Sequence, residues 1–128
     1  MKEKYLEQAK DKQWKVCTYG LGYLGKKLRH TIPQMFGLNT DYYCDTDDKK
    51  VDDAEYSDSK SIYRRELKKI EEPVIVFVLV DDPYDIEIEE DLKENSNIYT
   101  YTLRELALMD KVICEFYGEE LFDMYKKL

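Results

Sequence analysis

Three glycines in the stretch KVCTYGLGYLGKKLRH, residues 15–30, have the spacing of a turn that binds nucleotide phosphates. In such turns the first glycine permits the tight turn after a strand, and the second lets a pyrophosphate approach the backbone. The third lets the following helix pack closely on the strand, and the N-terminal N–H groups of that helix face the anion. The positions expected to contact phosphate are therefore Gly20, Leu21, Gly22, Tyr23, Leu24 and Gly25.

An acidic residue follows this turn at the distance that dinucleotide binding requires. Asp45 lies 20 residues after Gly25, where a second apolar segment ends, and Thr46 is its neighbour. A carboxylate at this position accepts hydrogen bonds from the ribose hydroxyls of a dinucleotide. Asp45 and Asp47 would also repel a 2′-phosphate, which disfavours NADP. The alternative is that the glycines serve only a tight strand-to-helix connection, because acids are common in a chain with 28 of them.

Other residue types that perform chemistry give weaker patterns. His30 is the only histidine, and we expect it to lie at a helix end rather than to act in catalysis. Asp81 and Asp82 follow an apolar segment and could hold Mg²⁺ beside a phosphate, but a solvated loop or a helix cap is the simpler interpretation. We therefore expect no catalytic residue and no metal site, and leave enzymatic activity open.

A tyrosine four residues before a lysine, the spacing that short-chain dehydrogenases use for proton transfer, occurs at Tyr23/Lys27 and at Tyr56/Lys60. The first pair would lie within the first helix and the second in a polar loop. Neither place suits that chemistry, and chance matches are expected among 12 tyrosines.

Alternating strand and helix signals position these residues. Runs of β-branched and aromatic residues predict strands over 14–20, 39–45, 74–80 and 97–101. Helical spacing predicts helices over 21–30, ending before Pro33, and over 61–72, 82–95 and 102–110, the last with Thr102 and Glu105 as a capping box. Residues 2–12 read as a solvent-facing helix or a frayed lead-in, and 47–60 as a loop. The tail from residue 111 is read as a helix, with a fifth strand over 112–116 as the alternative.

This order predicts an α/β fold, a Rossmann-like three-layer αβα arrangement with a mostly parallel sheet of four or five strands. A chain of 128 residues is expected to form a single domain, residues 1–128. The continuous apolar run 74–80 is typical of a central parallel strand covered on both faces.

Composition limits the partners. The chain carries 28 acidic and 20 basic residues, a net charge of −8, which argues against nucleic-acid binding. The longest apolar run, residues 73–80, is too short to cross a bilayer, and the N-terminal segment lacks the apolar core of a signal peptide. Three scattered cysteines, expected to line the core, fit a reducing compartment. We therefore expect a cytoplasmic protein without membrane insertion.

The glycine turn, Asp45 and the TLREL box at 102–106 also resemble a known family. The stretch from about residue 14 to 110 is similar to small Rossmann-type modules of bacterial surface-polysaccharide and sugar-modification proteins. These modules occur as N-terminal domains of sugar O-acyltransferases, beside FkbM-type methyltransferases, or alone. The resemblance implies binding of a nucleotide or nucleotide sugar, with NAD as a possible cofactor and the chemistry in a partner enzyme domain.

Three hypotheses follow. The first is a module that binds an NAD-like dinucleotide or a nucleotide sugar for surface-polysaccharide biosynthesis. The second is a small enzyme using such a ligand and completed by dimerisation. The third is a scaffold that binds no nucleotide and self-associates through the apolar tail residues Leu121, Phe122, Met124, Tyr125 and Leu128.

Overall fold

The computed structural model of the chain describes residues 2–126, and side chains over residues 2–119. Its centre is one parallel sheet with the strand order β3-β2-β1-β4-β5. The strands are β1 (Lys15–Tyr19), β2 (Tyr42–Cys44), β3 (Lys60–Ser61), β4 (Val74–Val78) and β5 (Ile98–Thr102). The helices are α1 (Glu3–Lys12), α2 (Tyr23–Leu28), α3 (Thr31–Met35), α4 (Asp48–Asp53), α5 (Arg64–Leu67), α6 (Tyr84–Leu92), α7 (Leu103–Met109) and α8 (Lys111–Lys126).

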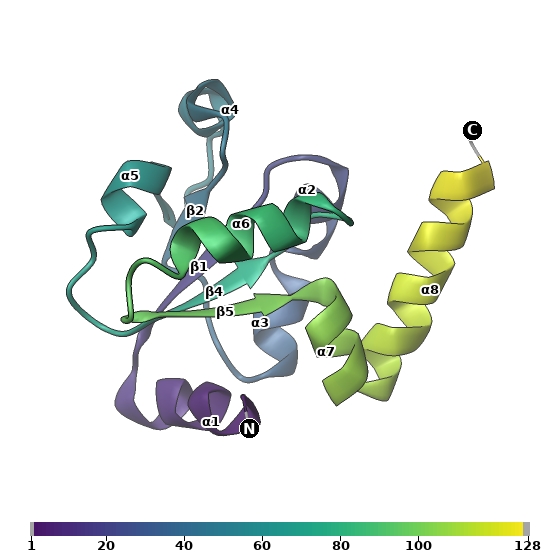
Figure 1. Ribbon diagram of the computed structural model, residues 1–128, viewed down its shortest axis with the longest axis horizontal. Helices are drawn as coiled ribbons and strands as arrows, with labels where there is room; N and C mark the ends of the chain where they lie inside the picture. The colour runs from purple at the N-terminus through teal and green to yellow at the C-terminus, as the bar shows by residue number, and fades with distance from the viewer. Residues whose placement is uncertain (1, 127–128) are drawn as a thin grey trace.

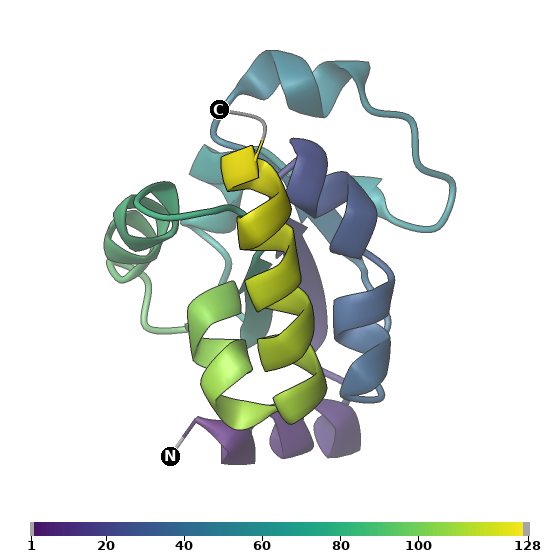
Figure 2. The same ribbon diagram turned by 90° about the vertical axis from the view of Figure 1, so that its right-hand side faces the viewer.

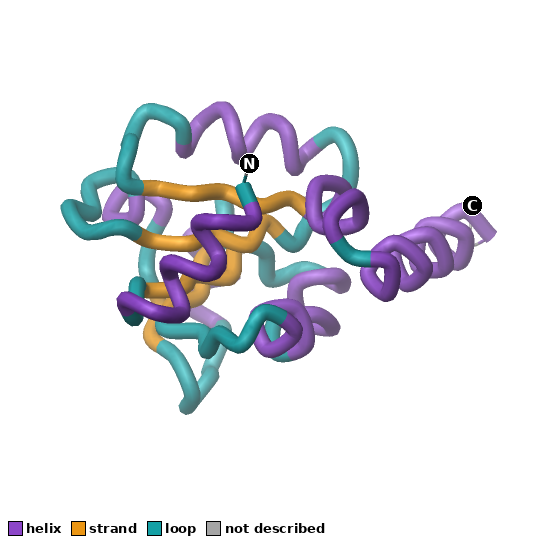
Figure 3. Tube along the Cα trace, turned by 90° about the horizontal axis from the view of Figure 1, so that it is seen from below, coloured by secondary structure: helices purple, strands orange, loops and turns teal. Residues whose placement is uncertain are grey.

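The predicted fold class is confirmed: helices flank a five-stranded, all-parallel sheet in a Rossmann-like three-layer arrangement (Figures 1 and 3). β4 is the buried strand that its apolar run predicts, and every one of its residues is buried. It pairs with β1 on one side and β5 on the other, with Val76 opposite both Cys17 and Thr100. Both faces of this strand are covered, so the side chains that point to either face are buried. Polar residues at every second position would therefore be costly here.

Alternate side chains of the strands supply two separate cores. On one face, β4 contributes Ile75 and Phe77 to a cluster closed by helices α1, α2, α3, α7 and α8. On the other face, Val76 and Val78 pack with Cys17 and Cys44 under α5 and α6. In Figure 1, α6 lies in front of the sheet and α1 crosses below it. α1 is therefore more than a frayed lead-in, because it buries Leu6 and Ala9 in the first core.

The predicted helix over 21–30 is wrong in its extent. The structure has two short helices instead, and Pro33 lies within the second, α3, rather than beyond the helical segment. The N-cap of α3 is His30, so Pro33 occupies the first turn. There its missing N–H is tolerated, since the first N–H groups of a helix have no partner within the helix.

The loop predicted over 47–60 is also wrong in part, because it contains α4 and the first residue of the edge strand β3. Asp47 caps α4 by accepting a hydrogen bond from the Lys49 N–H, and Val51 is its one buried anchor. The segment 111–117 is helical, as preferred, and begins α8. The capping box of Thr102 and Glu105 is confirmed at the start of α7.

Helix α8 lies beside α7, and its C-terminal end extends away from the sheet (Figures 1 and 2). Ile113 is buried in the first core and Phe116 packs at its margin. The apolar tail side chains proposed for self-association lie outside the described residues. No helix in the described part of the chain combines the length and apolarity needed to span a membrane.

Candidate functional site

Two of the three glycines in the turn are required by close backbone packing. Gly20 follows β1 with a φ of +128°, and a Cβ atom there would lie 2.8 Å from the Leu79 carbonyl oxygen. A Cβ atom at Gly25 would lie 1.9 Å from the carbonyl oxygen of Gly20. Any side chain at Gly25 would push α2 away from the end of β1. These two glycines therefore have a structural reason that needs no ligand.

Gly22 is different, because no neighbouring atom excludes a side chain there, although it is the N-cap of α2, where glycine is among the favoured residues. A Cβ atom at this position would have no heavy atom within 4 Å. Its φ of −82° and ψ of −161° are extended values open to any residue. Gly22 borders a cleft, and this is the position at which a phosphate approaches the backbone in dinucleotide-binding turns.

Asp45 lines the cleft and also accepts hydrogen bonds from two backbone N–H groups beside it. Its Oδ2 accepts a hydrogen bond of 2.8 Å from the Leu21 N–H, and its Oδ1 accepts one of 2.9 Å from the Asp47 N–H. The Leu21 N–H predicted to face a phosphate is therefore donated to Asp45 in this structure. Each carboxylate oxygen has a second lone pair, so Asp45 can still accept a bond from a ligand hydroxyl.

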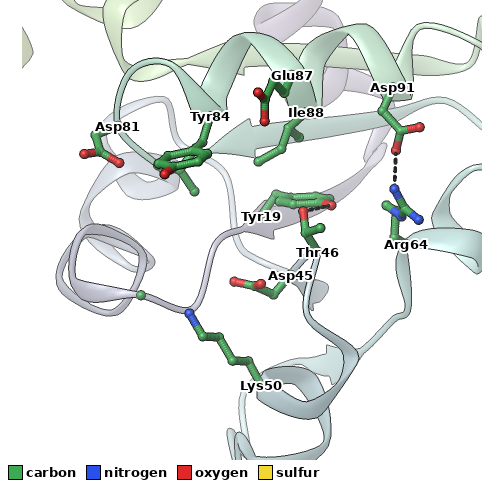
Figure 4. Close-up of a pocket in the computed structure, with 12 residues that line it drawn as sticks. Tyr19, Asp45, Thr46, Lys50, Arg64, Asp81, Tyr84, Glu87, Ile88 and Asp91 are labelled. Atoms are coloured by element: carbon green, nitrogen blue, oxygen red, sulfur yellow. Dashed lines mark hydrogen bonds and ion pairs between the residues drawn. The ribbon is translucent and has the colours of Figure 1, made fainter.

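The cleft, shown in Figure 4, has a volume of about 450 Å³. It lies at the carboxyl ends of β1, β2 and β4, and α6 forms its opposite wall. The chain runs from β1 outward to β2 and β3 and then back to β4 on the other side of β1. Open α/β sheets bind their ligands at such a reversal of strand order. The lining residues are Tyr19, Gly22, Asp45, Thr46, Lys50, Arg64, Val80, Asp81, Tyr84, Glu87, Ile88 and Asp91.

The floor of the cleft is formed by Tyr19, whose hydroxyl lies 2.8 Å from the Thr46 Oγ1. Burial raises the pKa of this phenol above its ordinary value, so Tyr19 is neutral at physiological pH. Beneath it, burial raises the pKa of the Cys44 thiol to about 12 and also raises that of Cys17. These groups therefore supply hydrogen bonds and packing rather than proton transfer or an active thiolate.

Charged side chains of both signs surround the floor. The acids are Asp45, Asp81, Glu87 and Asp91, and the bases are Lys50 and Arg64. Arg64 forms an ion pair with Asp91, with 3.3 Å between Nη1 and Oδ2. Carboxylates accept hydrogen bonds from hydroxyl groups, whereas a basic side chain attracts a phosphate. The cleft therefore suits a ligand that carries several hydroxyls and a limited negative charge.

The structure places the predicted site residues in three environments. Gly22, Asp45 and Thr46 line the cleft. Gly20 and Gly25 form the turn behind it, and the Leu21 and Leu24 side chains are buried in apolar clusters, so only their backbone groups are near a ligand. The Tyr23 side chain is exposed on α2, with its hydroxyl 3.4 Å from Lys27 Nζ.

The remaining sequence candidates lie elsewhere. His30 contacts Arg29, with Nε2 2.7 Å from Nη1, and the Tyr56 ring stacks on the same guanidinium at 3.5 Å. Asp82 pairs with Arg104 at 2.7 Å, so the Asp81/Asp82 pair is split between the cleft and an ion pair. Of the cysteines, Cys17 and Cys44 line the core as expected, whereas Cys114 is exposed on α8.

Sequence reasoning missed the far wall of the cleft. The α6 residues Tyr84, Glu87, Ile88 and Asp91 line it, and their spacing of three and four places them on one helix face. On a helix face turned toward the sheet, a mixture of polar and apolar residues indicates a cleft rather than a fully packed core. Lys50 and Arg64 gave no such signal, because they come from the short helices α4 and α5.

Comparisons with protein-family models, with curated protein sequences and with solved structures find no significant match. The geometry of this cleft is therefore the basis on which a function is inferred.

Proposed function

We propose that the chain binds a nucleotide or a nucleotide sugar in the cleft at the carboxyl ends of β1, β2 and β4. The observation that carries the proposal is the contrast among the three glycines. Packing accounts for Gly20 and Gly25, but Gly22 has open space around it and faces the cleft. A glycine that the fold does not need is explained by a ligand group that approaches the backbone closely.

The parts of such a ligand match different parts of the cleft. The phosphates lie against Gly22, and ribose or sugar hydroxyls donate to Asp45 and to the carboxylates of α6. The base or a sugar ring packs on Tyr84, which is 59% exposed, and on Ile88. A volume of about 450 Å³ is within the range of sites that enclose small ligands.

The proposed role is that of a binding module. Among the described residues that line the cleft there is no histidine, and the Tyr19 phenol is held neutral by burial. The resemblance to modules of polysaccharide-biosynthesis proteins supports a nucleotide sugar and a separate enzyme domain as partner. It also motivates our proposal of a bacterial, cytoplasmic setting.

A thermal-shift screen tests the proposal. The candidates are NAD, FAD and the UDP-, GDP- and CDP-sugars, with adenosine and free glucose as comparisons that lack a phosphate. At a hundredfold excess over Kd, a ligand stabilises the folded state by about 2.7 kcal/mol, enough to raise Tm by roughly 10 °C. We expect at least one phosphorylated ligand to do so. An unchanged Tm with all of them would contradict the proposed function.

A further inference from the structure

Lys50 extends from α4 into the cleft on the side of the glycine turn (Figure 4). It was not among the residues expected to contact a ligand. We propose that the Lys50 ammonium contacts the phosphate group of the bound nucleotide. This inference rests on the proposed function and assigns to its site a cation that the glycine motif does not contain.

A series of hydrogen bonds fixes the start of α4, and with it the Lys50 backbone, relative to the glycine turn. The Leu21 N–H donates to Asp45 at 2.8 Å, and the Asp47 N–H donates to the other Asp45 oxygen at 2.9 Å. Asp47 in turn caps α4 by accepting from the Lys49 N–H at 3.0 Å. The buried Val51 anchors the same helix in the apolar cluster of Leu21 and Tyr43. The turn and the first residues of α4 therefore form one connected unit.

The charges in the cleft favour a basic contact for a phosphate at this place. Arg64 is already paired with Asp91, and four carboxylates line the same space in a chain of net charge −8. A phosphate entering without a basic contact would be repelled by these carboxylates. Over the residues that the structure describes, Lys50 forms no ion pair, so its charge is available to a ligand.

Lys49 provides the matched control. It lies next to Lys50 on α4 and is exposed, but it is not among the residues that line the cleft. Lys50→Met and Lys49→Met remove the same charge from the same helix and keep a residue with similar helix propensity. A general change in net charge affects both variants equally, whereas loss of a phosphate contact affects only the first.

The experiment is isothermal titration calorimetry of wild type and both variants with ADP and adenosine, and with UDP and uridine. Wild type and Lys49→Met should bind the diphosphate of at least one pair more tightly than its nucleoside. Lys50→Met should weaken diphosphate binding about fivefold to tenfold and leave nucleoside binding unchanged.

Three results would overturn the inference. Equal diphosphate affinity in the two variants would show that Lys50 makes no phosphate contact. Loss of diphosphate and nucleoside affinity in the same proportion in Lys50→Met would show a change in cleft shape instead. Absence of binding of all four compounds to wild type would overturn this inference, and an unchanged Tm with every ligand of the thermal-shift screen would overturn the proposed function as well.

Discussion

The Asp45 carboxylate accepts a hydrogen bond of 2.8 Å from the Leu21 N–H, which joins the end of β2 to the glycine turn after β1. Its second oxygen accepts from the Asp47 N–H and so also fixes the start of α4. In dinucleotide-binding sequences an acid at this position binds ribose. In this chain Asp45 also links the glycine turn to the start of α4. Loss of ligand binding on its removal would not by itself identify a ribose contact.

We predict that Asp45→Ala lowers the free energy of unfolding by about 2 kcal/mol, because two backbone N–H groups lose a charged acceptor. Urea denaturation of the unliganded protein measures this change. Asp53→Ala, at the exposed end of α4, is the control and should change stability by less than about 0.5 kcal/mol. Equal stability of the two variants would show that the Asp45 link contributes nothing.

Alanine at Gly25 and at Gly22, in the same turn, should lower the free energy of unfolding by very different amounts. Gly25→Ala places a methyl group 1.9 Å from the Gly20 carbonyl oxygen, which requires α2 to move, and we predict a loss of about 3 kcal/mol or more. Gly22→Ala meets no atom within 4 Å, and we predict a loss of about 1 kcal/mol or less, because alanine is a poorer N-cap of α2 than glycine. Denaturation curves of both variants measure the difference. Similar losses in both would mean that the turn packs differently.

Arg104 should stabilise the loop that leads from β4 into α6. Its Nε donates to Asp85 Oδ2 at 2.7 Å, and the Asp85 side chain is only 1% exposed. Arg104→Ala leaves this carboxylate buried without its cation, and we predict a loss of about 2–3 kcal/mol in unfolding free energy. Asp82→Ala removes only the exposed partner of Arg104 and should cost below about 1 kcal/mol. A larger cost for Asp82→Ala would contradict this assignment.

Asp58 should make stability depend on acid pH. The hydrogen bond from Arg29 is the main cause that lowers the pKa of Asp58 below its ordinary 3.8. Because the folded-state pKa is the lower one, the stabilisation is present above about pH 4 and is lost as pH falls through the lowered value. The difference in unfolding free energy between wild type and Asp58→Asn should therefore be larger near pH 6 than near pH 2.5. An equal difference at both pH values would refute the pairing.

The long elements with a strong apolar pattern were predictable, and the short polar ones were not. The all-apolar run of β4 and the capping box of Thr102 and Glu105 gave the sheet centre and α7. β3 has two exposed residues, Lys60 and Ser61, so it is defined by backbone pairing to β2 and has no side-chain signal. The helix before Pro33 ends ahead of it as predicted, but the separate helix α3 was missed, because proline is accepted in the first turn of a helix.

The site was predictable only where a motif describes it. The glycine turn and Asp45 are brought together as the spacing indicates, and Gly22, Asp45 and Thr46 share one cleft. The residues facing them across the cleft come from α5 and α6, which are distant in sequence and meet them only through the sheet order. Asp45 also accepts hydrogen bonds from two backbone N–H groups, and the sequence pattern does not indicate this second role.

Replacement of Gly22, the glycine of the turn that has open space around it, tests the proposed phosphate contact. Gly22→Val adds a side chain that favours the extended backbone present there, and Gly118→Val adds the same group at an equally open position on α8. Both are titrated by calorimetry with the nucleotide that gives the largest thermal shift. We predict that Gly22→Val lowers Tm by only a few degrees, because valine is a poorer N-cap than glycine, and loses about a hundredfold or more in affinity, while Gly118→Val binds as wild type does. Wild-type affinity in Gly22→Val would contradict a phosphate at the turn.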